Sequence, residues 1–404
     1  MENKETKSKL PKPVKIIIYA VVAVLLCLLV YFSFQNRKKA AYRIAYTSDI
    51  PEAVIEELRE CMDRQFVGKI DYIELSDSYI PSKKCSSQFD LLLTQKGKKS
   101  RDFKAYAKEF IPVAFDSIPE YILTPFNEDG KYMELPLLYD PYIIASLKNT
   151  DRYFNLSIPE DTEEWESFLL DAKKIVSDPL YFDSGDDKTL LAFLSSLLIT
   201  YGGPVSYKNF AESAMSYPEV SFEELCSLPL GSTSSGEVFS FNSVLTLLKF
   251  YFNEKLFTPS VNNADETEDK MENRSAYIVY SSLSDFSALK NDITSNYSFT
   301  TFPQDYSFED MAVTAPSIIA LNFSKKEITA TVARYLTLTQ TQNLLSRASN
   351  LVPSASSSTG SALVDFLQSY TTWCTYGPLP DLYTYSFEKE TARTFAEEVR
   401  KCVF

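Results

Sequence analysis

The sequence predicts an α/β fold preceded by one N-terminal transmembrane helix, and three observations support this prediction. Residues 16–34 form a continuous apolar run without a charged side chain. Beyond residue 42, segments with the two-residue periodicity of strands alternate with segments of helical periodicity, an order typical of a parallel sheet flanked by helices. The chain has 404 residues, 45% hydrophobic and 23% charged, which is long enough for two domains or lobes.

The apolar run at 16–34 has the length that a bilayer requires. About 19 helical residues at a rise of ~1.5 Å span roughly 28 Å. The polar and cationic stretch 35–39 follows directly and is unlike a signal-peptide cleavage site, so we expect an uncleaved anchor. Cys27 follows Leu26 rather than a small residue, which disfavours lipid attachment. We therefore expect a single-pass protein of the cell membrane, with residues 1–15 as a short tail on the cytoplasmic side. The large domain is then extracytoplasmic, either periplasmic or at the cell surface.

The first elements beyond the anchor predict a small parallel sheet. Residues 42–48 alternate as a strand does, and 69–75 and 89–94 are two further expected strands. Between the first two, Ser48 to Pro51 has the residue types of a helix start. Apolar side chains then recur at helical spacing as far as Phe66.

After Pro136 the pattern becomes mostly helical. We expect helices over 165–175 and 190–201, the latter stopped by Gly202-Gly203-Pro204, and another from Ser243. Residues 205–240 are rich in Ser and predict irregular structure, and 262–273 predicts an acidic loop. Two buried strands follow at 276–280 and 317–321, and possible capping boxes at 324–327 and 339–342 each open a helix.

Composition excludes several classes of function. The net charge of −14 argues against a nucleic-acid partner, because duplex binding depends on Lys and Arg neutralising phosphates. The chain has no histidine, which excludes a Ser–His–Asp triad, an HExxH zinc site and an imidazole base. Only ten glycines occur and no nucleotide-binding glycine motif is present. We therefore expect no cofactor and no metal site.

Four stretches, taken in order, carry a resemblance to a known family. They are 130–136 (GKYMELP) with 147–151 (LKNTD) and 158–166 (IPEDTEEWE), the helix at 243–259, the strand at 273–280 (NRSAYIVY), and 323–353 with its two helix starts. In order and spacing they resemble the extracellular solute-binding proteins of ABC importers, the broad family of maltose- and sugar-binding receptors. The resemblance covers residues 43 to about 400.

The resemblance implies a periplasmic-binding-protein-like fold of two α/β lobes joined by crossing hinge strands. Mapped onto this sequence, lobe one is 42–139 with 283–316, and lobe two is 140–282 with 317–404. A small solute, most readily a carbohydrate, would be held between the lobes, and their closure would be recognised by ABC permease subunits. Such a receptor is not an enzyme.

The resemblance also selects candidate ligand-binding residues. Cleft loops follow the carboxyl ends of parallel strands, and aromatic faces with hydroxyl groups suit a sugar. The candidates are Thr47, Ser48 and Asp49 after the first strand, Asp90 at the third, Tyr139, Asp140 and Tyr142 at the first hinge crossing, Tyr280, Ser281 and Ser282 at the second, and Trp373 and Tyr376 near the C-terminus. Each has a structural alternative: a helix cap for 47–49, a solvated strand end for Asp90, and core packing for the aromatic residues.

Two other functions stay open at this point. The chain could be a ligand-free domain that acts as a sensor or protein-interaction module at the membrane, which few glycines and a retained anchor favour. A carboxylate-based glycosidase would require two facing carboxylates about 5–9.5 Å apart, and no spacing in the sequence selects such a pair.

Overall fold

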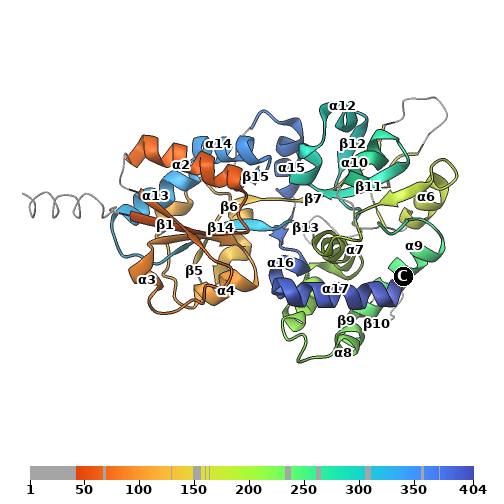
Figure 1. Ribbon diagram of the computed structural model, residues 1–404, viewed down its shortest axis with the longest axis horizontal. Helices are drawn as coiled ribbons and strands as arrows, with labels where there is room; N and C mark the ends of the chain where they lie inside the picture. Colours follow the sequence, from red (N-terminus) through yellow and green to blue (C-terminus); the bar gives the residue numbers. More distant parts are fainter. Residues whose placement is uncertain are drawn as a thin grey trace, which may run out of the picture.

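The computed structural model describes residues 42–66, 70–128, 130–148, 156–159, 161–162, 164–232, 238–260, 265–304, 311–355, 359–372 and 374–404. These residues form two α/β lobes that lie side by side (Figure 1). The expected tail 1–15 and anchor 16–34 lie outside the described residues.

The first lobe is built on a six-stranded sheet in the order β15-β6-β14-β3-β1-β2. Its strands are β1 (Tyr42–Thr47), β2 (Ile70–Leu75), β3 (Leu91–Gln95), β6 (Glu134–Tyr139), β14 (Ser317–Asn322) and β15 (Val352–Pro353). β1 is parallel to β2 and β3, as the sequence predicts, whereas β14 is antiparallel to both of its neighbours, β3 and β6. The carboxyl ends of β1, β3 and β6 therefore share one edge with the start of β14.

Helices cover both faces of this sheet. They are α2 (Glu52–Phe66), α3 (Cys85–Gln88), α4 (Lys98–Lys104), α5 (Glu120–Leu123), α13 (Ile328–Thr337) and α14 (Thr339–Ser349), with short 3-10 turns η1 (Pro112–Phe115) and η2 (Thr124–Phe126) and the hairpin β4 (Asn127–Glu128) and β5 (Lys131–Tyr132). The apolar stripe of α2, with Val54, Ile55, Leu58 and Met62, is buried on one face. A cluster containing Phe89, Phe103 and Phe323 fills the other.

The second lobe is built on a four-stranded sheet in the order β12-β7-β11-β8. Its strands are β7 (Tyr142–Leu147), β8 (Asp178–Tyr181), β11 (Ala276–Ser282) and β12 (Tyr297–Thr300). Around it lie α6 (Trp165–Ala172), α7 (Asp187–Ala214), α8 (Phe222–Ser227), α9 (Phe241–Asn253), α10 (Asp265–Glu272), α11 (Leu283–Ala288), α12 (Asn291–Thr294), α16 (Leu382–Ser386), α17 (Lys389–Val403) and the ribbon β9 (Pro229–Ser232) and β10 (Val238–Ser240).

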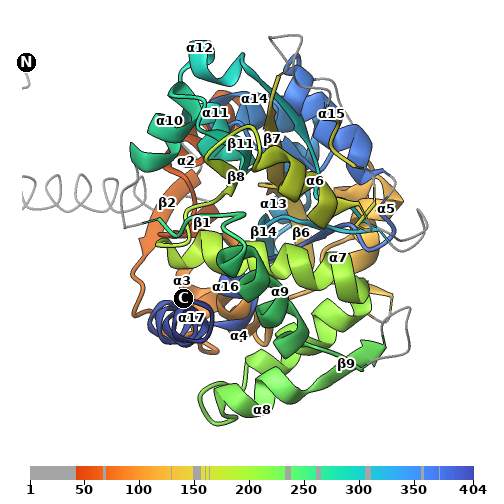
Figure 2. The same ribbon diagram turned by 90° about the vertical axis from the view of Figure 1, so that its right-hand side faces the viewer.

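The long helix α7 is the centre of the second lobe's core (Figure 2). Among the described residues, α7 is the helix that is long and apolar enough to span a membrane. However, 78% of its apolar 18-residue stretch is buried inside the lobe, so α7 packs as a core helix. Gly203 has φ 83° and interrupts the helix before Pro204. The predicted stop is therefore a kink, after which the chain resumes a helix up to Ala214, because Tyr207, Phe210 and Ala211 can still be buried on the same core.

Three segments connect the lobes. The first runs from Tyr139 to Tyr142 between β6 and β7. The second contains β13 (Val313–Thr314) and leads from β12 into β14, and the third leaves β15 through α15 (Ala362–Thr371) to β16 (Pro378–Leu379). β13 and β16 pair in parallel, so the second and third connections lie side by side.

The observed lobes differ from the predicted ranges. β12 pairs with β7, so residues near 297–300 belong to the second lobe rather than the first. β14 lies between β3 and β6, and β15 pairs with β6, so 317–353 belongs to the first lobe. The prediction placed the second crossing after Ser282, whereas α11 begins there and the chain crosses after β12. Buried apolar strands such as 317–321 fit either sheet equally well, so pattern alone could not assign them.

Two smaller predictions also change. Residues 205–240 are not irregular throughout but contain the end of α7, α8 and the β9–β10 ribbon, and the acidic stretch 262–273 contains α10. The five cysteines among the described residues are free thiols, and Cys61, Cys85 and Cys374 are buried.

Candidate functional site

The carboxyl edge of the first sheet faces the junction between the lobes. Lys96 N donates to Ser317 O at 2.7 Å, and Asp140 N donates to Pro316 O at 2.9 Å. These two bonds join the ends of β3 and β6 to the start of β14 at the point where the chain crosses. Residues that follow the strands here are therefore held between the lobes by backbone hydrogen bonds.

Asp140 is the first charged residue of the junction. It lies in the crossing between β6 and β7 and accepts hydrogen bonds from Ser284 N at 3.0 Å and Ser284 Oγ at 2.6 Å. Burial raises the pKa of this carboxyl group, although Lys188 and the Ser284 hydrogen bonds oppose the shift. The crossing thus holds a partly desolvated carboxylate against the start of α11.

Two further charges, Lys188 and Asp381, complete this hinge cluster. Lys188 is in the first turn of α7, and Asp381 is the N-cap of α16, where its Oδ1 accepts from Thr384 N at 2.7 Å. Burial raises the pKa of Asp381, and Lys188 opposes that shift. Burial lowers the pKa of Lys188, but the carboxylates of Asp140, Asp381 and Asp285 outweigh it and the net shift is upward.

One oxygen of this cluster has no partner. Asp381 is fully buried, yet its Oδ2 accepts no hydrogen bond from the described residues. A buried carboxylate oxygen without a donor is costly, by about 1–3 kcal/mol or more.

Aromatic residues form the wall behind the cluster. The rings of Tyr142 and Tyr280 stack with centroids 5.2 Å apart and an interplanar angle of 10°. Tyr280 OH is 2.8 Å from Ser196 Oγ, which is 2.9 Å from Thr314 Oγ1 in the second crossing. The stack and this hydroxyl chain tie β7, β11, α7 and β13 together, so they fix the geometry of the hinge.

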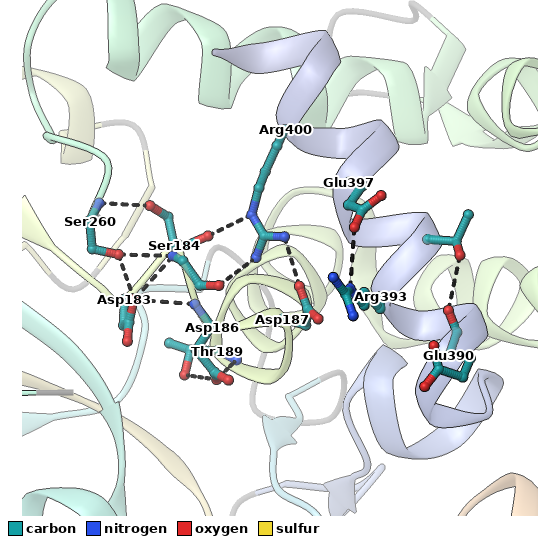
Figure 3. Close-up of polar contacts among 12 residues, drawn as sticks. Asp183, Ser184, Asp186, Asp187, Thr189, Ser260, Glu390, Arg393, Glu397 and Arg400 are labelled. Carbon is teal, nitrogen blue, oxygen red and sulfur yellow. Dashed lines mark hydrogen bonds and ion pairs between the residues drawn. The ribbon is translucent and has the colours of Figure 1, made fainter. Parts of the chain in front are cut away.

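Arg400 binds the loop that leads into the first turn of α7, where Lys188 lies. From α17 it donates to Ser184 O at 2.9 Å, to Gly185 O at 3.0 Å and to Asp187 Oδ1 at 2.7 Å (Figure 3). These contacts fasten the first turn of α7 to the C-terminal helix. Arg400 thereby positions Lys188 without reaching the junction itself.

Beside the hinge cluster lies a cavity of about 280 Å³ between the lobes. Its walls come from β3–α4 and β6 of the first lobe and from α7 and β16–α16 of the second; they include Lys96, Gly97, Arg101, Lys104, Glu134, Tyr207, Lys208, Glu212, Pro380 and Tyr385. The lobes touch at its edge, where a Cβ at Gly97 would lie 2.0 Å from the Thr384 carbonyl oxygen. Glycine is required at this position by that close approach.

The structure brings together some of the predicted ligand residues. Asp140, Tyr142, Tyr280 and Ser282 meet at the hinge, but both tyrosines are buried in packing, and Ser282 caps α11 through Asp285. Ser281 is buried beside it and donates to Ser282 O. Of this group, Asp140 is the residue whose charge reaches the junction.

Other predicted residues have structural contacts. Tyr139 is buried, with its hydroxyl 2.8 Å from Thr371 Oγ1 of α15. Thr47 is buried and bonds to Asp49, whereas Ser48 and Asp49 are exposed at the carboxyl edge and line a separate surface hollow that no second-lobe residue joins.

Asp90 and Tyr376 do not line the cavity. Asp90 precedes β3 and so lies at the opposite, amino edge of the sheet, where it pairs with Arg43 and Lys326. Tyr376 is half-buried ahead of β16, and its backbone N–H bonds to Met311 O. Trp373 lies outside the described residues.

Lys188, Asp381 and Arg101 were missed by the sequence analysis. Lys188 follows three acidic or cap-forming positions in a helix start, and Asp381 follows Gly377-Pro378-Leu379-Pro380, so each has the pattern of an ordinary surface residue. The Gly-Pro-rich turn before Asp381 was the available signal, because such turns bring a chain back across a junction. No group of three or more metal-ligating side chains is found in the part of the chain that the structure describes.

Comparison with solved structures identifies the architecture. The bacterial solute receptor AcbH, which has an exclusive preference for β-D-galactopyranose, matches with a TM-score of 0.66 and 12% identity over 90% of this chain and 98% of its own. A probable secreted solute-binding lipoprotein from Streptomyces coelicolor matches with a TM-score of 0.64 and 12% identity over 91% and 98%. The fold is that of the bacterial solute-binding receptors.

This receptor fold accommodates different cargoes. Other matched structures are named for chitin oligosaccharide, maltotriose and maltose. The apo ferric ion-binding protein A of Pasteurella haemolytica also matches, with a TM-score of 0.54 and 13% identity over 90% of this chain and 99% of its own. No protein-family model and no curated protein sequence matches the chain. The receptor fold is thus established by structure, and the solute has to be argued from the site.

Proposed function

We propose that this chain is a membrane-anchored, extracytoplasmic receptor that captures a small solute of carbohydrate type between its lobes for an ABC importer. The observation that carries the proposal is the cavity at the junction, which residues of both lobes line and which the third crossing borders at Leu379 and Pro380. A site divided between two lobes couples binding to lobe closure, which is a signal that a permease can read.

The chemistry of the junction supports capture of a polar molecule. Ser100, Arg101 and Lys208 place hydroxyl, guanidinium and ammonium groups in the cavity wall, and such groups can donate to the oxygens of a solute. Tyr207 and Tyr385 add aromatic surface to the cavity wall. A sugar offers hydroxyl groups for the first kind of contact and C–H faces for the second.

The test is a solute screen on the full-length chain purified in mild detergent. We expect the melting temperature to rise with at least one member of a library of monosaccharides, oligosaccharides and their derivatives, and calorimetry to give one site per chain. Arg101→Ala, in the cavity wall, should abolish the response, whereas Glu390→Ala, on the exposed face of α17, should retain it. A flat response across sugar, amino acid and peptide libraries would overturn the proposal.

The anchor is tested separately. Residues 16–34 carry this part of the proposal, and membrane fractionation of the full chain against a chain lacking residues 1–36 measures it. Release of the shortened chain from the membrane is expected. Protease accessibility from outside intact spheroplasts would confirm the extracytoplasmic side, and protection there would contradict it.

A second candidate is a ligand-free domain that acts as a sensor or interaction module. The direct contact of α16 with Gly97 and the ion pairs of Glu134 within the cavity favour it, since both fill space that a solute would use. The same screen separates the two candidates. An enzymatic role has no such support, because Glu134 is held between two lysines rather than facing a second carboxylate.

A further inference from the structure

The amino edge of the first sheet is the part of the described chain that follows the N-terminal apolar run most closely. β1 begins at this edge with Tyr42, whereas the second lobe joins at the opposite, carboxyl edge (Figure 1). Residues 35–41 alone separate the run at 16–34 from Tyr42. A chain of that length extends at most about 30 Å. An anchor at 16–34 therefore keeps the amino edge close to the membrane surface.

A buried aromatic cluster underlies this edge. The rings of Phe89 and Phe323 have centroids 5.0 Å apart, and the ring of Phe103 lies 6.4 Å from each of them. Phe89 precedes β3 and Phe323 follows β14, so the cluster lies at the amino edge. Tyr79 stacks on Phe103 with a centroid distance of 5.7 Å. The loops after β2, after α4 and after β14 therefore meet around one cluster.

Two of these loops turn large apolar side chains toward solvent. Ile80 is 83% exposed, Ile111 49% and Tyr106 36%. Each lies close to a fixed residue of the same loop: Tyr79 is stacked on the cluster, and Phe110 is buried. A single exposed apolar side chain is ordinary, but three around one cluster form a patch of the kind that contacts a partner.

Lysines accompany the apolar patch. Lys83 and Lys84 are exposed in the loop after β2, and Lys325 is exposed in the loop after β14. Glu109 and Glu327 are exposed there too, so charge alone would not select this edge. Isoleucine, tyrosine and lysine side chains together are typical of a surface that lies at a membrane interface. The apolar groups enter among the lipid headgroups, and the ammonium groups stay at the level of the phosphates.

The patch has a fixed frame and a hollow beside Ile111. Lys108 N donates to Asn322 O at 2.7 Å, and Asn322 Nδ2 donates to Glu109 O at 3.2 Å, which ties the loop after α4 to the end of β14. The hollow between this loop and the start of α13 has a volume of about 520 Å³, and Ile111 and Ala330 line it. The surface is thus formed before any partner arrives.

We propose that the amino edge of the first lobe docks on the headgroup layer of the membrane that anchors the chain, with Ile80, Tyr106 and Ile111 among the headgroups. The short connection to the anchor raises the effective concentration of this surface at the membrane, so a weak contact is enough to hold it there. This inference rests on the anchor in the proposed function. It orients the receptor, because the second lobe joins the edge that faces away from the lipid.

The test is quenching of tryptophan fluorescence by lipids brominated on their acyl chains. The full-length chain is reconstituted in phosphatidylcholine vesicles, with and without phosphatidylglycerol. Ile111→Trp reports on the amino edge, and Val238→Trp reports on the second lobe, where Val238 is 64% exposed. The two native tryptophans are present in both variants and give a common background. We expect the added emission to fall about twofold or more for Ile111→Trp, in both lipid mixtures, and to stay unchanged for Val238→Trp.

A second set of variants identifies the side chains that make the contact. With Tyr106→Trp as the reporter, Ile80→Glu combined with Ile111→Glu should abolish the quenching, because two carboxylates would have to leave water. Leu170→Glu combined with Val205→Glu, at exposed positions of the second lobe, should leave the quenching unchanged. All four positions are exposed, so each chain should keep its melting temperature.

Flotation of the same vesicles separates the possible failures. A chain that floats with the vesicles but shows no quenching at position 111, or equal quenching at 111 and 238, would overturn the docking surface and leave the anchor standing. Equal loss of quenching in both glutamate pairs would also overturn it. A chain that does not float would overturn the anchor itself, and the docking surface with it.

Discussion

The two edges of the first sheet treat buried charge in opposite ways. At the amino edge, Asp90 Oδ2 accepts from Arg43 N at 2.9 Å and from Lys326 Nζ at 3.0 Å, and lies 3.5 Å from Arg43 Nε. At the carboxyl edge, where the second lobe joins, the charged atoms Asp381 Oδ2 and Arg101 Nη1 are buried without a hydrogen-bond partner among the described residues.

The difference indicates which edge is built for stability and which for binding. A carboxylate that accepts from a backbone N–H and pairs with two cations, as Asp90 does, contributes to the fold. Partnerless buried atoms cost folding free energy and persist most readily where a ligand supplies the missing contacts. Replacing Asp90 at the amino edge should therefore lower stability without changing solute binding, whereas replacing the carboxylate of Asp381 at the carboxyl edge should not lower stability.

Removing the cation of the hinge cluster should give the largest effect. Lys188→Met leaves Asp140 and Asp381 facing each other without a compensating charge. We expect a loss of about 3 kcal/mol in the free energy of unfolding at pH 7, at the lower end for breaking a buried pair because Lys188 is partly exposed. Urea unfolding measures it. Lys174→Met, an exposed residue paired with Asp171, is the control and should change stability by less than about 1 kcal/mol.

The contact between the lobes should be the next most sensitive feature. Gly97→Ala places a Cβ against the Thr384 carbonyl, so α4 and α16 have to separate. We expect a loss of about 2 kcal/mol, as for overpacking, and a larger radius of gyration in solution scattering. Gly231→Ala meets only the Ser206 side chain, at 3.3 Å, and should change neither quantity appreciably. An unchanged radius together with unchanged stability would show that the lobes do not rest on this contact.

The amino edge provides the test of a fully partnered charge. Asp90→Asn weakens the interactions with Arg43 and Lys326, and we expect a loss of about 1–2 kcal/mol, since both cations are partly hydrated. Solute affinity, measured by calorimetry with whichever solute the screen identifies, should be unchanged. A change in affinity of tenfold or more would remove the distinction between the two edges.

Asp381→Asn should give the smallest change and the opposite sign. Burial raises the pKa of Asp381, so the folded chain holds this proton more tightly than the unfolded chain does. At pH 7 the neutral side chain should be more stable by about 1 kcal/mol, because it avoids burying the charge. As the pH falls, the wild-type carboxyl group is protonated in the folded state before it is protonated in the unfolded state. The stability of the wild type therefore rises relative to that of the variant, and the difference in unfolding free energy between them becomes smaller. Melting temperatures of both chains from pH 7 to pH 4.5 measure this, and a difference that widens on acidification would contradict it.

Much of the first lobe followed from local pattern. The strands at β1, β2 and β3 and the helix α2 lie within one or two residues of their predicted bounds, because alternation and helical spacing are properties of contiguous residues. The receptor fold itself was predicted from the order of weak motifs and agrees with the solved structures. The assignment of 283–316 and 317–353 to the lobes failed, since a buried strand carries no mark of which sheet it will join.

The candidate site was predicted less well than the fold. Asp140 was among the predicted residues because the residue that follows a crossing strand lies at the junction. The tyrosines predicted beside it are packed in the core. Lys188, Asp381 and Arg101 come from three separate elements, α7, α16 and α4, and meet only when the lobes are assembled.

The sequence alone determined the element types, the apolar run at the N-terminus, and the absence of histidine and of nucleotide-binding glycine motifs, because these depend on composition and on neighbours along the chain. Tertiary structure alone decided which buried charges are satisfied. Whether Asp90 finds two cations or Asp381 lacks a donor depends on what the other segments bring to that point in space. The position of a functional site in this chain is for that reason a property of the assembled lobes.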